Sequence, residues 1–126
     1  MFPNANHLAM AIKAASDTRL CKFKHGAIIY DKKGNVLSIG RNIPHYCPSY
    51  PSLLLHAEAD AILKCKRYDI KNTNILVVRV SKNKLRNSKP CEHCMSMILE
   101  SGIKNIYYSD ISGMISKVGD YNDQVY

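Results

Sequence analysis

The chain has 126 residues, a net charge of +8 and a pI near 9.3. This length suits one domain spanning residues 1–126, and 46% hydrophobic with 22% charged residues is typical of a globular protein in water. The sequence has no apolar run of about 18 residues and no secretory signal, so we expect a cytoplasmic or nuclear protein without a membrane segment. The positive charge favours an anionic partner, such as a nucleotide phosphate or a polynucleotide, without establishing one.

The N-terminal part is predicted to form a helix followed by a β-hairpin. Apolar residues recur at helical spacing over residues 4–15, with Asn4 as the N-cap. Two apolar runs, 26–30 and 36–40, flank the turn sequence Asp-Lys-Lys-Gly-Asn, which is typical of a hairpin. Three prolines predict a loop over 41–52, and a loop of this length without structure of its own favours a role in admitting substrate.

The rest of the chain alternates between helical and strand patterns. The predicted elements are a helix over 53–68, a buried strand over 74–80, a polar basic loop over 81–89, a helix from Pro90–Cys91 to Ser101 that Gly102 ends, a strand over 103–110 and a last strand over 114–118. Strands separated by a helix should be parallel, and strands joined by a short turn should be antiparallel. We therefore predict an α/β fold with a five-stranded mixed sheet packed by helices, ending in an antiparallel hairpin.

Two short motifs together predict a metal site. His56 supplies an imidazole nitrogen, and Cys91 and Cys94 supply two thiolates, which is a donor set that suits tetrahedral zinc. Three protein ligands leave a fourth position open, as in catalytic zinc sites. Glu58 lies two residues after the histidine and could move protons at that position. On a regular helix Glu58 would face about 200° away from His56, so both can serve one centre only from the first turn.

The remaining cysteines and histidines are given structural roles. Cys21, Cys47 and Cys65 are expected to be buried or partly buried thiols. His93 should point away from the chelating face, and the other histidines have no predicted role at the site.

At His56-Ala57-Glu58 and Pro90-Cys91-Glu92-His93-Cys94 the chain resembles the cytidine deaminase-like superfamily of zinc-dependent deaminases. The histidine ligand is similar to deoxycytidylate, tRNA-adenosine and polynucleotide-editing deaminases. The segment 21–27 and the short turn 111–113 are similar to free cytidine deaminases. The resemblance implies a three-layer fold, a bound Zn2+ and Glu58 as the catalytic proton carrier. It also implies that homodimers or homotetramers are common.

Three residues are candidates for substrate binding. Gly40-Arg41-Asn42 is similar to a family motif whose asparagine contacts the sugar, although Asn42 could also be an ordinary turn asparagine. The resemblance places Phe23 near the base, with ordinary core packing as the alternative. The backbone of Ala57 could hold the base edge. One of Tyr107 and Tyr108 should be core, and the other could border the pocket.

These motifs predict a zinc-dependent hydrolytic deaminase that converts cytosine to uracil. The cytosine could belong to a cytidine or deoxycytidine nucleoside, a nucleotide or a single-stranded nucleic acid, as in nucleic acid editing. Adenine deamination on a nucleoside or a tRNA-like RNA is an alternative, because the zinc motif does not distinguish the two bases. A catalytically idle zinc domain that binds RNA or a protein is a second alternative.

Overall fold

The computed structural model describes residues 1–18, 24–44, 54–65 and 69–119. Within these ranges the chain forms three helices and eight strands. In chain order they are α1 (Ala5–Ser16), β1 (Lys24–Tyr30), β2 (Val36–Arg41), β3 (Ile43–Pro44), β4 (Leu54–Leu55), α2 (Ala57–Lys64), β5 (Asn74–Ser81), β6 (Lys84–Arg86), α3 (Glu92–Ser101), β7 (Asn105–Ser109) and β8 (Ile115–Lys117).

The main sheet is mixed, as predicted. Its strands lie in the order β2-β1-β5-β7-β8, and β6 pairs with the C-terminal end of β5. β5 and β7, which α3 separates in the chain, are parallel, and every other pair is antiparallel. The predicted C-terminal hairpin is confirmed by the antiparallel pairing of β7 with β8. The sheet therefore has the predicted five strands and one more, β6.

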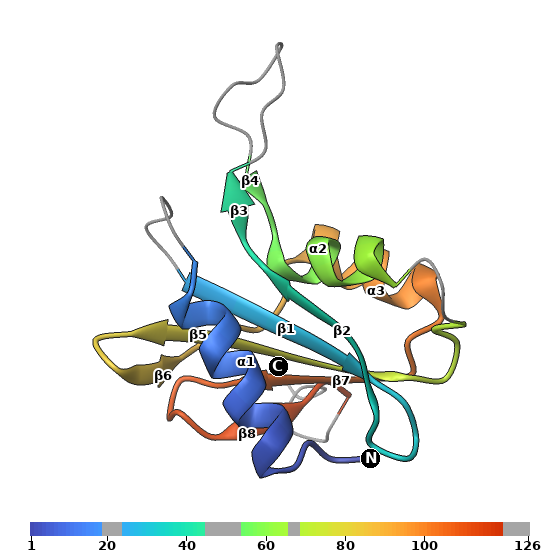
Figure 1. Ribbon diagram of the computed structural model, residues 1–126, viewed down its shortest axis with the longest axis horizontal. Helices are drawn as coiled ribbons and strands as arrows, with labels where there is room; N and C mark the ends of the chain where they lie inside the picture. The colour runs from blue at the N-terminus through green and yellow to red at the C-terminus, as the bar shows by residue number, and fades with distance from the viewer. Residues whose placement is uncertain (19–23, 45–53, 66–68, 120–126) are drawn as a thin grey trace.

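The helices cover the two faces of the sheet and make three layers. Figure 1 shows α1 across one face, with α2 and α3 side by side against the other. Successive side chains of β5 point to opposite faces of the sheet, so this strand contributes to the packing on both faces. Ile75 and Val77 pack into the cluster with α2 and α3, whereas Leu76 and Val78 pack into the cluster with α1. All four side chains are fully buried, and each such burial stabilises the fold by about 1.5–3 kcal/mol.

Two glycines of the hairpin let the helices approach the sheet closely. A Cβ at Gly26 would collide with the carbonyl oxygen of Ala11 in α1. A Cβ at Gly40 would collide with the carbonyl oxygen of Ala57, and it would lie 2.5 Å from the backbone nitrogen of Ala61. Glycine at position 40 thus sets the depth at which the first turn of α2 lies against β2.

The first helix begins where the sequence predicts. The side-chain oxygen of Asn4 accepts a hydrogen bond from the backbone N–H of His7 at 2.9 Å, and Nδ1 of His7 accepts one from the N–H of Asn4 at 3.1 Å. This reciprocal cap fixes the entry to α1. His7 also stacks on Tyr30 with ring centroids 4.0 Å apart, which makes it a structural histidine.

Three of the sequence predictions are wrong in their details. The helix predicted over 53–68 begins only at Ala57, because Leu54–Leu55 pairs with Ile43–Pro44 as a small two-stranded sheet. For the same reason the segment 41–52, predicted to be a loop, contains β3, and β2 extends to Arg41. The segment 81–89, predicted to be a loop, contains β6. The lysine and arginine residues of this segment are typical of a loop. They are also common on outer strands, where they prevent pairing with other chains. Lys82 and Asn83, both with positive φ, form its turn.

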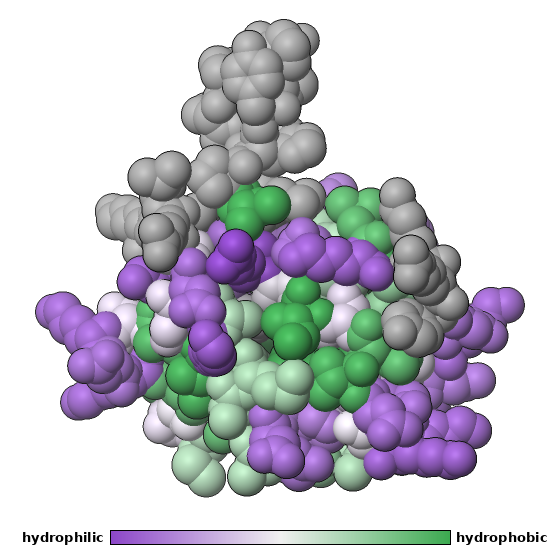
Figure 2. Space-filling view, viewed as in Figure 1, coloured by the Kyte–Doolittle hydropathy of each residue, from purple (hydrophilic) through white to green (hydrophobic). Residues whose placement is uncertain are grey.

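The face seen in Figure 2 is hydrophilic along its left and right margins and hydrophobic around β2. β2 is an outer strand of the sheet, and its Ile39 side chain is 40% exposed. Among the described residues, no helix is long and apolar enough to cross a membrane.

Candidate active site

The start of α2 provides the first half of the site. His56 is the N-cap of this helix and has extended backbone angles (φ −70°, ψ 152°), while its carbonyl accepts the N–H of Asp60 at 3.0 Å. The imidazole makes no capping bond and remains available as a ligand. Glu58 follows within the first turn and is 5% exposed. Because His56 precedes the helix, the 200° separation expected on a regular helix does not apply, and both side chains reach one centre.

The start of α3 provides the second half. Cys91 is the N-cap with φ −67° and ψ 168°, and its carbonyl accepts the N–H of Met95 at 2.8 Å. The Cys91 side chain is exposed, whereas Cys94, three residues later, is 1% exposed. The helix ends at Gly102 in the left-handed conformation (φ 93°), as predicted. Both segments that carry the predicted ligands therefore lie at N-termini of helices on the same face of the sheet.

His56, Cys91 and Cys94 come together as the sequence predicts. One ligand atom from each side chain lies within 4.8 Å of the others, and Nδ1 of His56 is 3.1 Å from Sγ of Cys94. One imidazole and two thiols fit zinc, which takes nitrogen and sulfur ligands in a tetrahedral arrangement. Three residues of this kind could hold the ion, as in catalytic zinc sites, which have three protein ligands.

Glu58 lies in an environment that favours its protonated form. Burial raises the pKa of the Glu58 carboxyl, and its own backbone N–H, the nearby His56 and the Cys94 thiol oppose that rise. Burial also raises the pKa of the Cys94 thiol, and the Glu58 carboxyl adds to the effect. A bound cation would offset the cost of holding these acidic groups together. A buried carboxyl beside a cation site is suited to accept and return a proton.

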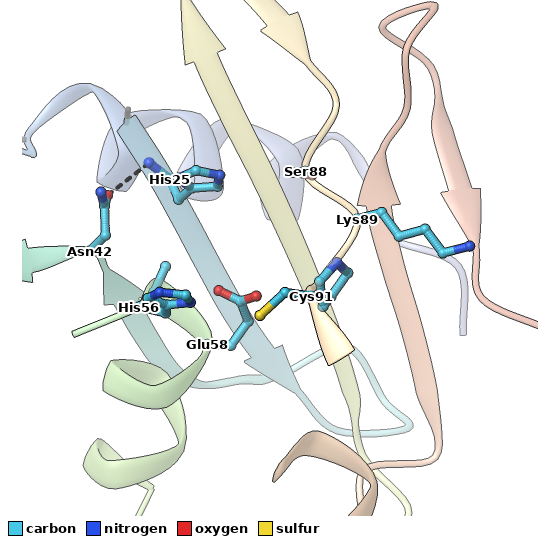
Figure 3. A pocket seen from close by; sticks show the side chains of 9 residues that line it. His25, Asn42, His56, Glu58, Ser88, Lys89 and Cys91 are labelled. Carbon is cyan, nitrogen blue, oxygen red and sulfur yellow. Dashed lines mark hydrogen bonds between the residues drawn. The ribbon is translucent and has the colours of Figure 1, made fainter. Parts of the chain in front are cut away.

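A cavity of about 170 Å3 opens beside these groups. Figure 3 shows the side chains of His56, Glu58 and Cys91 directed into it from the two helix starts. The described residues that line it are His25, Asn42, His56, Ala57, Glu58, Ser88, Lys89, Pro90 and Cys91. The predicted substrate residues Asn42 and Ala57 are thus both at the cavity. Phe23, the third, lies outside the described residues.

Asn42 is tied to the first strand. Its side-chain oxygen accepts a hydrogen bond from the backbone N–H of His25 at 2.8 Å, and Asn42 is 2% exposed. The bond is drawn in Figure 3, where the His25 ring lies over the cavity. Burial lowers the pKa of His25 to about 4, and the charges of Arg79 and His56 contribute, so its ring is neutral at pH 7.

The sequence interpretation missed His25 and Ser88, and it considered Lys89 only as part of the basic loop over 81–89. One signal could have identified His25, since it lies two residues after Phe23 and residues two apart in an extended segment face the same side. Ser88 and Lys89 immediately precede Pro90 and could have been found by their place beside the ligand motif. His93 is exposed, as predicted, and lies outside the group of metal-ligating side chains.

Comparison with protein families finds a match over most of the chain. The family model described as the cytidine and deoxycytidylate deaminase zinc-binding region matches residues 3–110. A search of curated proteins gave no match.

Solved structures with a similar fold include deaminases from three sources. Cytidine deaminase from Burkholderia pseudomallei superposes with a TM-score of 0.70 at 19% identity, covering 92% of this chain and 91% of that one. Cytidine deaminase from Mycobacterium leprae gives 0.64 at 16% identity, with 89% and 90% covered. The apo dCMP deaminase of cyanophage S-TIM5 gives 0.62 at 23% identity, with 85% and 82% covered. These likenesses establish the fold.

Proposed function

Because the chain belongs to the family of the cytidine and deoxycytidylate deaminase zinc-binding region, which consists of hydrolytic zinc-binding enzymes, we propose that it converts cytosine to uracil by hydrolysis. The supporting observation is the buried Glu58 beside the three-residue group of His56, Cys91 and Cys94 at a cavity. The overall reaction adds water to cytosine and releases ammonia. The substrate would be a cytidine or deoxycytidine nucleoside, a nucleotide or a single-stranded nucleic acid.

In this proposal His56, Cys91 and Cys94 hold the zinc ion. When bound, zinc lowers the pKa of a water molecule and so supplies a nucleophile near neutral pH. The Glu58 carboxylate would take up a proton from the attacking water and would deliver it to the ring nitrogen next to the amino-bearing carbon. A second proton, moved through the same carboxyl, leaves with the amino group as ammonia. The burial that raises the pKa of Glu58 helps it to hold each proton between these steps.

The other lining residues would bind and orient the substrate. The backbone of Ala57, fully buried at the start of α2, would contact the base edge. Asn42 would contact the sugar, and its bond to the His25 backbone fixes the side-chain orientation. Phe23 is proposed to pack near the base. Assembly as a homodimer or homotetramer, a single domain over 1–126 and a cytoplasmic or nuclear location also remain predictions.

The test measures ammonia release from cytidine, deoxycytidine, dCMP, adenosine and cytosine-containing single-stranded oligonucleotides, with zinc-loaded protein. Glu58→Gln should lower cytosine turnover by about 10²- to 10⁴-fold while retaining zinc. Glu92→Gln, the same change at an exposed acid in the first turn of α3, is the matched control and should retain turnover.

Different outcomes identify which part of the proposal is wrong. Ammonia release from adenosine but from no cytosine-containing substrate would show that the base is adenine. Zinc binding with no release from any substrate, or equal release from Glu58→Gln and the wild type, would favour an idle zinc domain over an enzyme.

A further inference from the structure

The imidazole of His25 forms part of the wall of the active-site cavity on the side of the sheet. His25 is the second residue of β1, and Ala27 and Ile29 of the same strand pack into the buried cluster with α2 and α3. Because side chains alternate along a strand, His25 points to the same face of the sheet. Figure 3 shows its ring on the opposite side of the cavity from His56 and Glu58. The apolar row of β1 therefore ends in a polar ring at the cavity.

His25 and Asn42 are neighbours across the sheet. Gly26 pairs with Arg41 in the antiparallel register of β1 and β2, so His25 lies opposite Asn42. The backbone N–H of His25 donates to Oδ1 of Asn42 at 2.8 Å, and its carbonyl accepts the backbone N–H of Asn42 at 3.4 Å. Side chains at opposite positions of antiparallel strands lie on the same face, with Cβ atoms about 5 Å apart. The two polar side chains are therefore adjacent in the cavity wall.

The ring of His25 has no hydrogen-bond partner within the described part of the chain. Its backbone groups bond to Asn42, but neither ring nitrogen bonds to another described residue. The side chain is partly buried, and polar atoms in such places are normally hydrogen-bonded. Burial lowers the pKa of His25 to about 4, with contributions from the charges of Arg79 and His56. At pH 7 the ring therefore offers one N–H donor and one acceptor nitrogen to a molecule in the cavity.

The place of this pair in the cavity fits the sugar end of a nucleoside. In the proposed function, the amino-bearing carbon of the base lies at Glu58 and the metal-ligating group. The amino group and the sugar are attached at opposite ends of a cytosine ring, so the sugar lies away from these groups. Asn42, which would contact the sugar, is adjacent to His25. A hydroxyl both donates and accepts, so it can bond to either nitrogen of the imidazole.

We propose that His25 binds a sugar hydroxyl next to the one bound by Asn42, so that the site prefers ribose to deoxyribose. This inference rests on the proposed function, since it concerns the substrate of the same site. A ribose carries its 2′ and 3′ hydroxyls on adjacent carbons and on the same face of the ring. Two adjacent polar side chains match these two hydroxyls. Deoxyribose would lose one of the two contacts, and a site that hydrogen-bonds a hydroxyl discriminates against an analogue that lacks it.

The test compares kcat/KM for cytidine, deoxycytidine and 3′-deoxycytidine in the wild type, His25→Leu and His93→Leu. The three substrates share one base, so the ratios between them report on the sugar and do not depend on the fraction of folded protein. The wild type should favour cytidine over each deoxy analogue by about tenfold or more, and His25→Leu should reduce at least one of these ratios by about five- to tenfold. His93→Leu is the same change at an exposed histidine outside the cavity lining, and it should change the ratios less than about twofold.

The pattern across substrates identifies the hydroxyl. A reduction confined to the ratio with deoxycytidine assigns His25 to the 2′ hydroxyl, and one confined to the ratio with 3′-deoxycytidine assigns it to the 3′ hydroxyl. Equal wild-type values for cytidine and deoxycytidine would overturn the inference. Unchanged ratios in His25→Leu would also overturn it, because a purely structural role lowers kcat/KM for all three substrates alike. An equal fall of the ratios in both variants would overturn it as well, since His93 lies outside the cavity lining.

A binding measurement keeps this test separate from that of the reaction. Uridine and deoxyuridine, the corresponding products, are titrated into the same three proteins by calorimetry. Tighter binding of uridine that His25→Leu abolishes and His93→Leu preserves would support the sugar contact even if no substrate released ammonia. Equal or undetectable binding of the two products by the wild type would overturn it even if deamination were observed.

Discussion

The Oγ atoms of Ser88 and Ser109 lie 2.8 Å apart in the interior, where the segment before the predicted ligand Cys91 crosses the end of β7. The Ser88 hydroxyl donates to the carbonyl of Val77, and it accepts the backbone N–H of Ser109 at 2.9 Å. The Ser109 hydroxyl in turn donates to the carbonyl of Arg86 at 2.6 Å. Two small hydroxyls thus join β5, β7 and the end of β6 immediately before the metal motif.

Replacing Ser88 should cost more than the loss of one hydrogen bond. Ser88→Ala leaves the buried carbonyl of Val77 and the N–H of Ser109 without this partner, so we expect a loss of about 1–3 kcal/mol in the free energy of unfolding. Ser96→Ala, at an exposed position of α3, should change it by less than about 0.5 kcal/mol. Urea denaturation of the three proteins measures both values. Equal stabilities would show that the serine pair is not structural.

Gly40→Ala should displace α2, because the added Cβ would collide with the carbonyl oxygen of Ala57. We expect a loss of about 1–3 kcal/mol or more in stability, together with weaker zinc binding, since His56 begins this helix. Gly113→Ala is the control, because it strains the backbone without displacing α2. Its Cβ would meet only the carbonyl oxygen of Leu85 at 3.7 Å, but its φ of +83° disfavours alanine. This variant should lose about 1 kcal/mol and keep its zinc. Normal zinc content in Gly40→Ala would contradict the prediction.

Removing zinc should lower the melting temperature. An ion that binds only the folded chain stabilises it by about 4 kcal/mol at a thousand times its dissociation constant. Cys94→Ser should abolish the difference between zinc-loaded and chelator-treated protein. Cys65→Ser, at another buried thiol outside the metal-ligating group, should preserve it. The measurements are calorimetric melting and zinc content by atomic absorption. A chelator effect that survives in Cys94→Ser would place the ion elsewhere.

The turn between β7 and β8 should respond to acid through Asp110. Hydrogen bonds from the side chains of Ser112 and Ser116, and from backbone N–H groups, lower the pKa of Asp110 to about 2. In the unfolded chain an aspartate side chain has a pKa near 3.9. The ionised carboxylate of Asp110 therefore adds stability above about pH 4, and this contribution is lost as pH falls towards 2. Asp110→Asn should therefore be less stable than wild type at neutral pH, and the difference should narrow at acid pH. Urea midpoints between pH 2 and 7 measure it, and a constant difference would contradict the assignment.

The sequence predicted the zinc-binding deaminase family, the mixed sheet and the C-terminal hairpin, and these are confirmed. It also predicted that His56, Cys91 and Cys94 would meet, because their order and chemistry are specific. The motif was informative because zinc restricts its ligands to few residue types and a compact arrangement.

The remaining features depend on contacts between segments that are distant in the chain. Leu54–Leu55 has the apolar character of the helix that follows, and only its pairing with Ile43–Pro44 makes it a strand. His25 reaches the cavity because β1 is held between β2 and β5, and this pairing brings it to residues that are distant in the chain. The roles of Glu58, Asn42, Ala57 and Phe23 in the reaction stay predictions.

The position of β5 also makes the predicted ligand group a non-local arrangement. His56 precedes this strand in the chain and Cys91 follows it, while β5 itself is inserted between β1 and β7. The two parts of the group therefore come together only through contacts between distant segments of the chain, and such contacts form slowly during folding. A newly made chain carries Cys91 and Cys94 as unprotected thiols until then. We expect capture of the ion to mark the end of folding and to close a period of vulnerability to oxidation.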